Sequence, residues 1–183
     1  RVLCVDDEPY ILDITKAFLE QSGDLRVDMA QSGYHAMRLL KEHTFDAVVS
    51  DYDMPEIDGI EFLKLVRLEI PDIPFLLFTG KGREEVVIEA LNNGADFYIQ
   101  KGGDVKAQFV ELEHKIRQSV KKRHAEYALS VSERHERFLV NIIKQSTQAF
   151  VVSYPDGGLG LPNQAFCQLS GYDEPQLKDI NWL

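Results

Sequence analysis

Residues 1–10 read RVLCVDDEPY, a short apolar run that is followed at once by three acidic side chains. The run Val2–Val5 is typical of a buried strand, and Asp6, Asp7 and Glu8 come where that strand would end. Like charges this close together repel one another unless a positive charge lies between them. The stretch therefore predicts a strand that delivers carboxylates to a site for a cation.

Apolar runs and amphipathic segments alternate in the same way over the following residues. A series of βα units favours a parallel sheet with helices on both faces. The sequence thus predicts an α/β fold with a doubly wound, five-stranded parallel sheet. The expected strands are Val2–Val5, Leu25–Ala30, Ala47–Ser50, Pro74–Thr79 and Asp96–Gln100. The expected helices are Tyr10–Gln21, Tyr34–His43, Ile60–Glu69 and Glu84–Asn92.

Polar side chains follow four of these strands at the point where each is expected to end. Asp6 and Asp7 follow the first strand, Asp51 the third, Thr79 the fourth and Lys101 the fifth. Ligands bind at the carboxyl ends of the strands in a sheet of this kind. Three carboxylates suit Mg²⁺, and a carboxylate can itself attack a phosphoryl group. A lysine and a hydroxyl would then stabilise the phosphoryl oxygens, so the pattern predicts a site for phosphoryl transfer.

The residues around these positions resemble the receiver domain of two-component response regulators over roughly residues 1–120. The matching segments are VDDE (5–8), SDYDMPEIDG (50–59), FTG (78–80) and IQKGG (99–103). The resemblance implies a flavodoxin-like fold in which Asp51 accepts a phosphoryl group from a histidine kinase.

The resemblance also implies the roles of the neighbouring residues. Asp7, Asp51 and the backbone carbonyl of Asp53 would ligate Mg²⁺ or Mn²⁺ directly, and Asp6 would do so through water. Thr79 would move toward the phosphoryl oxygens. Tyr98, three residues before the site lysine, would be the aromatic switch residue.

Two departures from the family pattern affect the site. Gly102 follows Lys101, where family members usually carry proline, and this puts a cis peptide at that bond in doubt. Asp53 and Lys81 occupy the two positions at which family members vary and tune dephosphorylation. We expect a pair between them to hinder the attacking water, with two solvated loop charges as the alternative.

Charge and composition exclude several classes of protein. Residues 1–104 carry 10 basic against 21 acidic side chains, which argues against nucleic-acid binding. No apolar run approaches the ~18 residues of a membrane span. The two cysteines, Cys4 and Cys167, have no metal-ligand spacing, so we expect reduced thiols and a cytoplasmic protein.

Apolar residues recur at a spacing of eleven between residues 105 and 145. One such set is Val105, Ile116, Tyr127 and Phe138, and the other is Phe109, Val120, Val131 and Ile142. This period indicates a long, nearly straight helix with one apolar stripe. We expect the last receiver helix to continue as a dimerising, coiled-coil linker through these residues. The alternative is a helix that packs back on its own domain.

The tail has a different pattern from the rest of the chain. An Asp-Gly turn at 156–157, NQAF at 163–166, GY at 171–172 and PQL at 175–177 resemble the start of a PAS sensor domain. We therefore expect a receiver core in residues 1–104, a helical linker in 105–145 and an incomplete PAS domain in 146–183. The remaining PAS strands are absent from the sequence, so we expect the natural protein to be longer. The PAS ligand is unknown.

The expected function is two-component signal transduction rather than enzymatic turnover. A phosphorylated receiver would relay its state through a homodimeric helix to the PAS module. The alternative is a haloacid dehalogenase-like phosphatase, which also forms an aspartyl phosphate and carries the D-x-D pattern seen at Asp51-Tyr52-Asp53. In that family the motif follows the first strand, whereas here it follows the third.

Overall fold

The protein is described by a computed structural model that covers residues 1–80, 84–155 and 157–178. The chain divides into two compact units, Arg1–Ala125 and Glu126–Leu183. No helix among the described residues is long and apolar enough to cross a membrane.

The first unit is built around a five-stranded parallel sheet with the strand order β2-β1-β3-β4-β5. Its strands are β1 (Val2–Val5), β2 (Val27–Ala30), β3 (Ala47–Ser50), β4 (Phe75–Thr79) and β5 (Phe97–Gln100). The predicted parallel sheet is thereby confirmed. β2 begins later than predicted because its register pairs Val27 with Val2, the first residue of β1.

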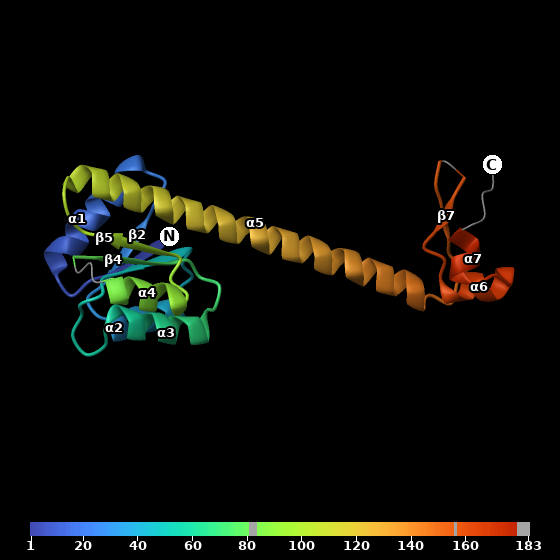
Figure 1. The fold of residues 1–183 in the computed structure, drawn as a ribbon, viewed down its shortest axis with the longest axis horizontal. Helices are drawn as coiled ribbons and strands as arrows, with labels where there is room; N and C mark the ends of the chain where they lie inside the picture. The colour runs from blue at the N-terminus through green and yellow to red at the C-terminus, as the bar shows by residue number, and fades with distance from the viewer. Residues whose placement is uncertain (81–83, 156, 179–183) are drawn as a thin grey trace. The chain divides into compact units, whose positions relative to one another are not determined.

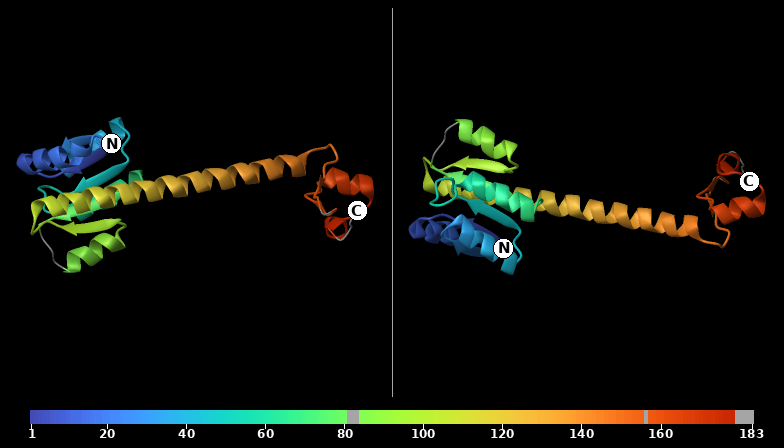
Figure 2. Two further views of the ribbon diagram at one scale, coloured as in Figure 1. Left: turned by 90° about the horizontal axis from the view of Figure 1, so that it is seen from above. Right: turned by 90° about the horizontal axis from the view of Figure 1, so that it is seen from below.

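Helices cover both faces of this sheet. They are α1 (Pro9–Leu19), α2 (Gly33–Glu42), α3 (Gly59–Glu69), α4 (Glu84–Asn92) and α5 (Val105–Gln145), with a 3₁₀ turn at Glu20–Ser22 after α1. Figure 1 shows α1 and α5 on one face and α2, α3 and α4 on the other, and the views from above and below in Figure 2 agree. Successive side chains of β1 point to opposite faces of the sheet and so contribute to both layers. Leu3 and Val5 join the core under α2, α3 and α4. Val2 and Cys4 join the core under α1 and α5.

Three helices, α1, α2 and α3, begin one residue earlier than predicted, and a polar side-chain cap precedes α2 and α3. The Ser32 side chain accepts a hydrogen bond from the backbone of His35 ahead of α2. Asp58 and Glu61 form a capping box ahead of α3. The prediction started α2 and α3 each at its first large side chain, one residue after the glycine that follows the cap.

Helix α5 is a single helix of 41 residues whose first part belongs to the receiver core. Ile116 is completely buried, and the Phe109 ring stacks on Phe18 with centroids 4.6 Å apart. Val120 packs against the same core. Phe109 and Ile116 are therefore unavailable for the predicted dimer contact, and Val120 is half-buried. This part of α5 packs on its own domain, as the alternative prediction has it.

The remaining members of the predicted stripe are exposed. They are Val105 at the start of α5, and Tyr127, Val131, Phe138 and Ile142 beyond the receiver core. Residues eleven apart return to the same side of a helix after three turns. The face of α5 that carries the stripe is thus covered by the receiver from Phe109 to Val120, whereas Val105 and the members beyond Val120 are exposed.

The second unit contains the end of α5 and a small C-terminal group of elements. These are an antiparallel pair, β6 (Val152–Ser153) and β7 (Leu159–Gly160), and two short helices, α6 (Gln164–Ser170) and α7 (Glu174–Lys178). Leu159, Pro162, Asn163 and Leu177 are buried among the described residues of this group. Helix α6 ends at Gly171, whose φ of 78° is the left-handed value that glycine adopts easily.

Candidate functional site

Side chains from four strand ends meet at the carboxyl edge of the sheet. Asp6 follows β1, Asp51 follows β3, Thr79 ends β4 and Lys101 follows β5. Asp6 is 5% exposed, Asp51 9% and Thr79 1%, so this edge buries two acids and a hydroxyl. Burying charged groups is costly unless they are paired, which raises the question of what pairs them.

Lys101 joins the two buried carboxylates. Its Nζ lies 2.7 Å from Asp51 Oδ1 and 2.8 Å from Asp6 Oδ2. The same ammonium lies 5.4 Å from the centre of the Phe78 ring, and the Lys101 backbone N–H donates to the Thr79 carbonyl at 2.7 Å. The lysine is thus fixed at both its backbone and its charged end, and it supplies the positive charge that the opening acidic stretch requires.

Backbone groups hold the second oxygen of each carboxylate. Asp6 Oδ1 accepts a hydrogen bond from the Glu8 N–H at 2.9 Å, and Asp51 Oδ2 accepts one from the Asp53 N–H at 2.7 Å. The Asp51 N–H in turn donates to the Val5 carbonyl at 2.8 Å. Both carboxylates are therefore held in one orientation by hydrogen bonds at each oxygen.

Electrostatics at the site follow from these contacts. Burial lowers the pKa of Lys101, but the hydrogen bonds that its ammonium donates to Asp51 and Asp6, together with the charges of these carboxylates, outweigh burial and raise the pKa above the ordinary lysine value. Burial, and then the negative charge of Asp51, raise the pKa of the Tyr98 hydroxyl. At neutral pH the site therefore holds a charged lysine and a neutral tyrosine.

A glycine allows the loop after Asp51 to pack tightly. A β-carbon on Gly59 would collide with the Asp51 carbonyl oxygen and would lie 2.8 Å from Leu77 Cδ2 and 2.9 Å from Tyr52 Cα. The Gly59 N–H donates to the Tyr52 carbonyl at 2.8 Å. The first turn of α3 thus lies directly against the backbone that carries Asp51.

The site fits a divalent cation only in part. Mg²⁺ commonly takes one or two carboxylates together with water and phosphate oxygens. Asp6 and Asp51 offer two buried carboxylates, whereas Asp7 is exposed. No three His, Cys, Asp or Glu side chains in the described part of the chain stand close enough together to enclose a metal ion. The donor set therefore suits a cation held by two carboxylates and water, and Asp7 would have to turn inward to join them.

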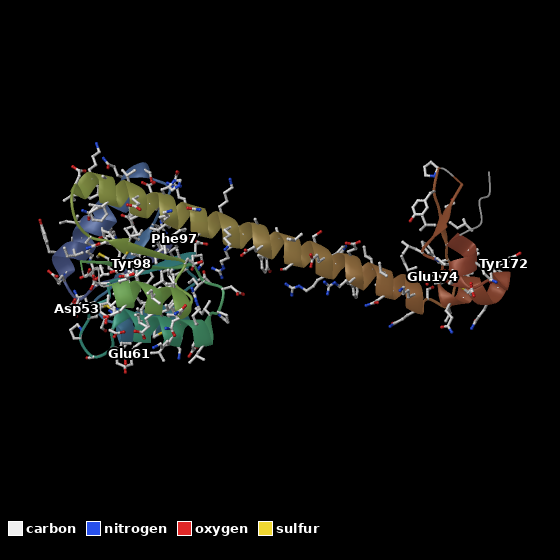
Figure 3. All side chains as sticks on the ribbon, in the orientation of Figure 1. Asp53, Glu61, Phe97, Tyr98, Tyr172 and Glu174 are labelled. Atoms are coloured by element: carbon white, nitrogen blue, oxygen red, sulfur yellow. The ribbon has the colours of Figure 1, made fainter. Side chains whose placement is uncertain are left out.

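The other predicted site residues have different placements. Tyr98 comes from β5, and Asp53 is exposed in the loop after β3; both are labelled in Figure 3. Lys81 lies outside the described residues, so its predicted pairing with Asp53 stays a prediction. The Lys101–Gly102 bond is trans, since the described residues contain no cis peptide.

Sequence reasoning missed two contributors to the site. Phe78 was read only as part of a strand, although its ring lies against the Lys101 ammonium. Gly59 entered the prediction only as the last residue of the matching segment 50–59. The Asp-Gly pair at 58–59, a helix cap followed by the smallest residue, was the signal that could have indicated a close backbone approach.

Comparison with known proteins identifies the family. The family model described as "Response regulator receiver domain" matches residues 2–113. The response regulator Rre1 of Synechocystis sp. is 35% identical over 105 residues, which cover 56% of this chain and 46% of that protein. The response regulator SaeR of Staphylococcus aureus is 39% identical over 101 residues, which cover 55% of this chain and 43% of that protein. The chain thus matches less than half the length of these relatives.

Solved structures show the same fold. A CheY-like receiver domain protein from Methanospirillum hungatei gives a TM-score of 0.63 at 28% identity, covering 69% of this chain and 97% of that one. The Francisella response regulator 1452 receiver domain gives 0.60 at 29% identity, covering 66% and 96%. Receiver domains are in general not enzymes, and this argues against the phosphatase alternative. The chain has a parallel sheet, two buried acids that contact a lysine, and these relatives. It therefore belongs to the response regulator receiver domain family.

Proposed function

We propose that Asp51 accepts a phosphoryl group from a histidine kinase in a two-component pathway. The observation that carries this proposal is the contact of 2.7 Å between Lys101 Nζ and Asp51 Oδ1 at the carboxyl edge of the sheet. A carboxylate held there is oriented for attack, and an ammonium is already in place for the charge that arrives.

The chemistry uses the residues of this edge and a phosphorylated donor. An Asp51 oxygen forms a bond to phosphorus while the bond between phosphorus and the kinase histidine nitrogen breaks, and that nitrogen keeps the electron pair. Lys101 and the Thr79 hydroxyl then stabilise the phosphoryl oxygens. Mg²⁺ or Mn²⁺ would supply further positive charge when bound; Asp51, the Asp53 carbonyl and Asp7, once turned inward, would hold it directly, and Asp6 would hold it through water.

Phosphorylation changes the charge balance around Lys101. The product carries about two negative charges in place of one, so it draws Thr79 and Lys101 inward. We propose that Tyr98 responds to this movement as the aromatic switch residue. We further propose that Asp53 and Lys81 set the lifetime of the phosphorylated state by hindering water, so that Lys81→Ala speeds the loss of the phosphoryl group. An unchanged rate of loss would remove this part of the proposal.

The state of the receiver is proposed to pass along α5 to a PAS-like tail whose ligand is unknown. The exposed stripe of Tyr127, Val131, Phe138 and Ile142 would contact the same stripe of a second copy. A helix with an uncovered apolar face is poorly stable alone, and a second copy offers an identical straight stripe.

Intact-mass measurement with acetyl phosphate and Mg²⁺ tests the phosphoacceptor. The wild type is expected to gain the mass of one phosphoryl group, and Asp51→Asn is expected to gain none. Asp13→Asn, which changes an exposed acid on α1, is the matched control and should be labelled like the wild type. Labelling of Asp51→Asn at the wild-type level, or a wild type that stays unlabelled, would refute the proposal. Repeated hydrolysis of a phosphate ester would instead favour a phosphatase.

A further inference from the structure

The end of α5 and the C-terminal elements meet at one buried polar side chain, Asn163. It is 1% exposed, which is unusual for an asparagine. Every polar atom of its side chain has partners, and those partners come from three separate segments of the second unit.

The side-chain oxygen of Asn163 binds the C-terminal elements. Oδ1 accepts a hydrogen bond from the Phe166 N–H at 3.0 Å, which makes Asn163 the cap of α6. The same oxygen accepts a second hydrogen bond from the Phe150 N–H at 2.9 Å, just ahead of β6. The backbone adds a further link, because the Asn163 N–H donates to the Phe150 carbonyl at 3.0 Å.

The side-chain nitrogen of Asn163 binds the end of α5 and the segment that follows it. Nδ2 lies 3.1 Å from the carbonyl oxygen of Ile143, which is in the last turn of the helix. It also lies 3.2 Å from the Ser146 carbonyl and 2.7 Å from the Gln148 carbonyl in the segment that follows. Carbonyls in the last turn of a helix lack the usual partner four residues on, and the Ile143 carbonyl accepts from the Asn163 amide in addition to the Ser146 N–H.

The oxygen of the Asn163 amide therefore connects the β6 segment to α6, whereas its nitrogen connects to the end of α5. The link between the β6 segment and α6 has backbone support, whereas the hydrogen bonds of Asn163 to the end of α5 come from the NH₂ group of its side chain. Between them, the Ser146 N–H donates to the Ile143 carbonyl and the Gln148 N–H to Ser146 Oγ, and the Ser146 and Gln148 carbonyls accept from Asn163. A fully satisfied buried amide of this kind fixes geometry more strongly than its single hydrogen bonds suggest.

We propose that Asn163 is the joint that fixes the C-terminal elements to the end of α5, so that they follow any rotation or translation of the helix. The chemistry selects asparagine, because a carboxylate could still cap α6 but would repel the three carbonyl oxygens. The joint itself is a property of the second unit. Its signalling meaning rests on the proposed function, in which α5 carries the state of the receiver.

Distances between two spin labels in the full chain test this joint. One label is placed at Glu136→Cys on α5 and the other at Gln168→Cys on α6, both exposed positions, in a Cys167→Ser background. Cys4 is completely buried and burial raises the pKa of its thiol to about 12, so it does not react in the folded protein. Dilution with unlabelled chain ensures that each measured distance lies within one molecule.

Two variants change Asn163: Asn163→Asp keeps the cap of α6, and Asn163→Ala removes both the cap and the contacts with α5. The control is Asn141→Ala, which changes an exposed asparagine on α5. The wild type and the control are expected to give one narrow distance distribution. Asn163→Asp is expected to lose it and to give a broad distribution while the far-ultraviolet circular dichroism of the helices is retained. Asn163→Ala should broaden the distribution at least as much.

A distribution in Asn163→Asp as narrow as that of the wild type would overturn the proposal. Phosphorylation of the same samples is measured by intact mass and is expected to be unchanged in all variants. Failure of the joint and failure of the proposed phosphoacceptor would thus appear in separate measurements.

Discussion

Lys101 is the residue on which the buried acids of the site depend. Its removal in Lys101→Ala would leave Asp6 and Asp51 buried side by side with no cation between them. We expect the free energy of unfolding of the receiver at neutral pH to fall by about 2 kcal/mol, since a charged hydrogen-bond partner is lost at a buried site. Urea titration measures this. Lys64→Ala, which breaks the exposed pair of Lys64 with Glu89, is the control, and its cost should stay near 0.5 kcal/mol.

The same contribution has a defined dependence on pH. The pKa of Lys101 is raised in the folded protein, so the folded state binds this proton more tightly than the unfolded chain does. The stabilisation is therefore complete below the ordinary lysine value of 10.5 and is lost as the pH rises through the higher folded-state value. The stability difference between wild type and Lys101→Ala should shrink only in that alkaline range. A difference that already disappears near neutral pH would contradict this assignment.

Gly59 makes a second prediction at the residue scale. In Gly59→Ala the new methyl group would meet the backbone of Asp51 and Tyr52, which cannot move aside as a flexible side chain could. We expect a loss of about 2 kcal/mol in stability and slower labelling by acetyl phosphate, because Asp51 would be displaced from Lys101. Gly102→Ala, where a β-carbon meets open space, is the control. Equal effects of the two substitutions would contradict the close approach at Gly59.

At the scale of secondary-structure elements, α5 is one helix with two environments along one face. Ile116 is fully buried in the receiver core, whereas Phe138, two eleven-residue steps further along the same stripe, is 60% exposed. We expect Ile116→Ala to destabilise the receiver by about 3 kcal/mol through the cavity it leaves. Phe138→Ala should leave the unfolding of the receiver unchanged and should weaken self-association. Urea unfolding and sedimentation velocity measure the two effects, and equal losses of stability would contradict the division of the helix.

The elements of the receiver could be predicted from the sequence because each carries its own local signal. Val2–Val5 and Ala47–Ser50 were predicted with the boundaries that the structure has, since both are short apolar runs closed by a polar residue. The end of the receiver contact on α5 could not be predicted. The eleven-residue period is the same before and after Val120, so the pattern gives an apolar face but not the surface that covers it.

At the scale of the whole molecule, the site could be predicted because strand ends of a parallel sheet converge whatever the loops between them do. Lys101 and Asp6 are 95 residues apart in sequence, yet both follow strands of the same sheet. The role of Asn163 could not be predicted in this way. Its partners at Ile143 and Gln148 are carbonyl groups of the backbone, and a backbone carbonyl leaves no trace in the sequence.

The division into two units leads to a last prediction, for a chain truncated to residues 1–125. Asp51, Lys101 and the core contacts of Ile116 all lie in the first unit, so the truncated protein should be labelled by acetyl phosphate as fast as the whole chain. The exposed residues Tyr127 and Phe138 lie in the second unit, so the truncated protein should be monomeric while the whole chain associates. Light scattering and intact mass on the same samples measure both properties. If residues 1–125 associate as strongly as the whole chain, the contact between copies must lie on the receiver itself, because the stripe beyond Val120 would then contribute nothing to the free energy of association.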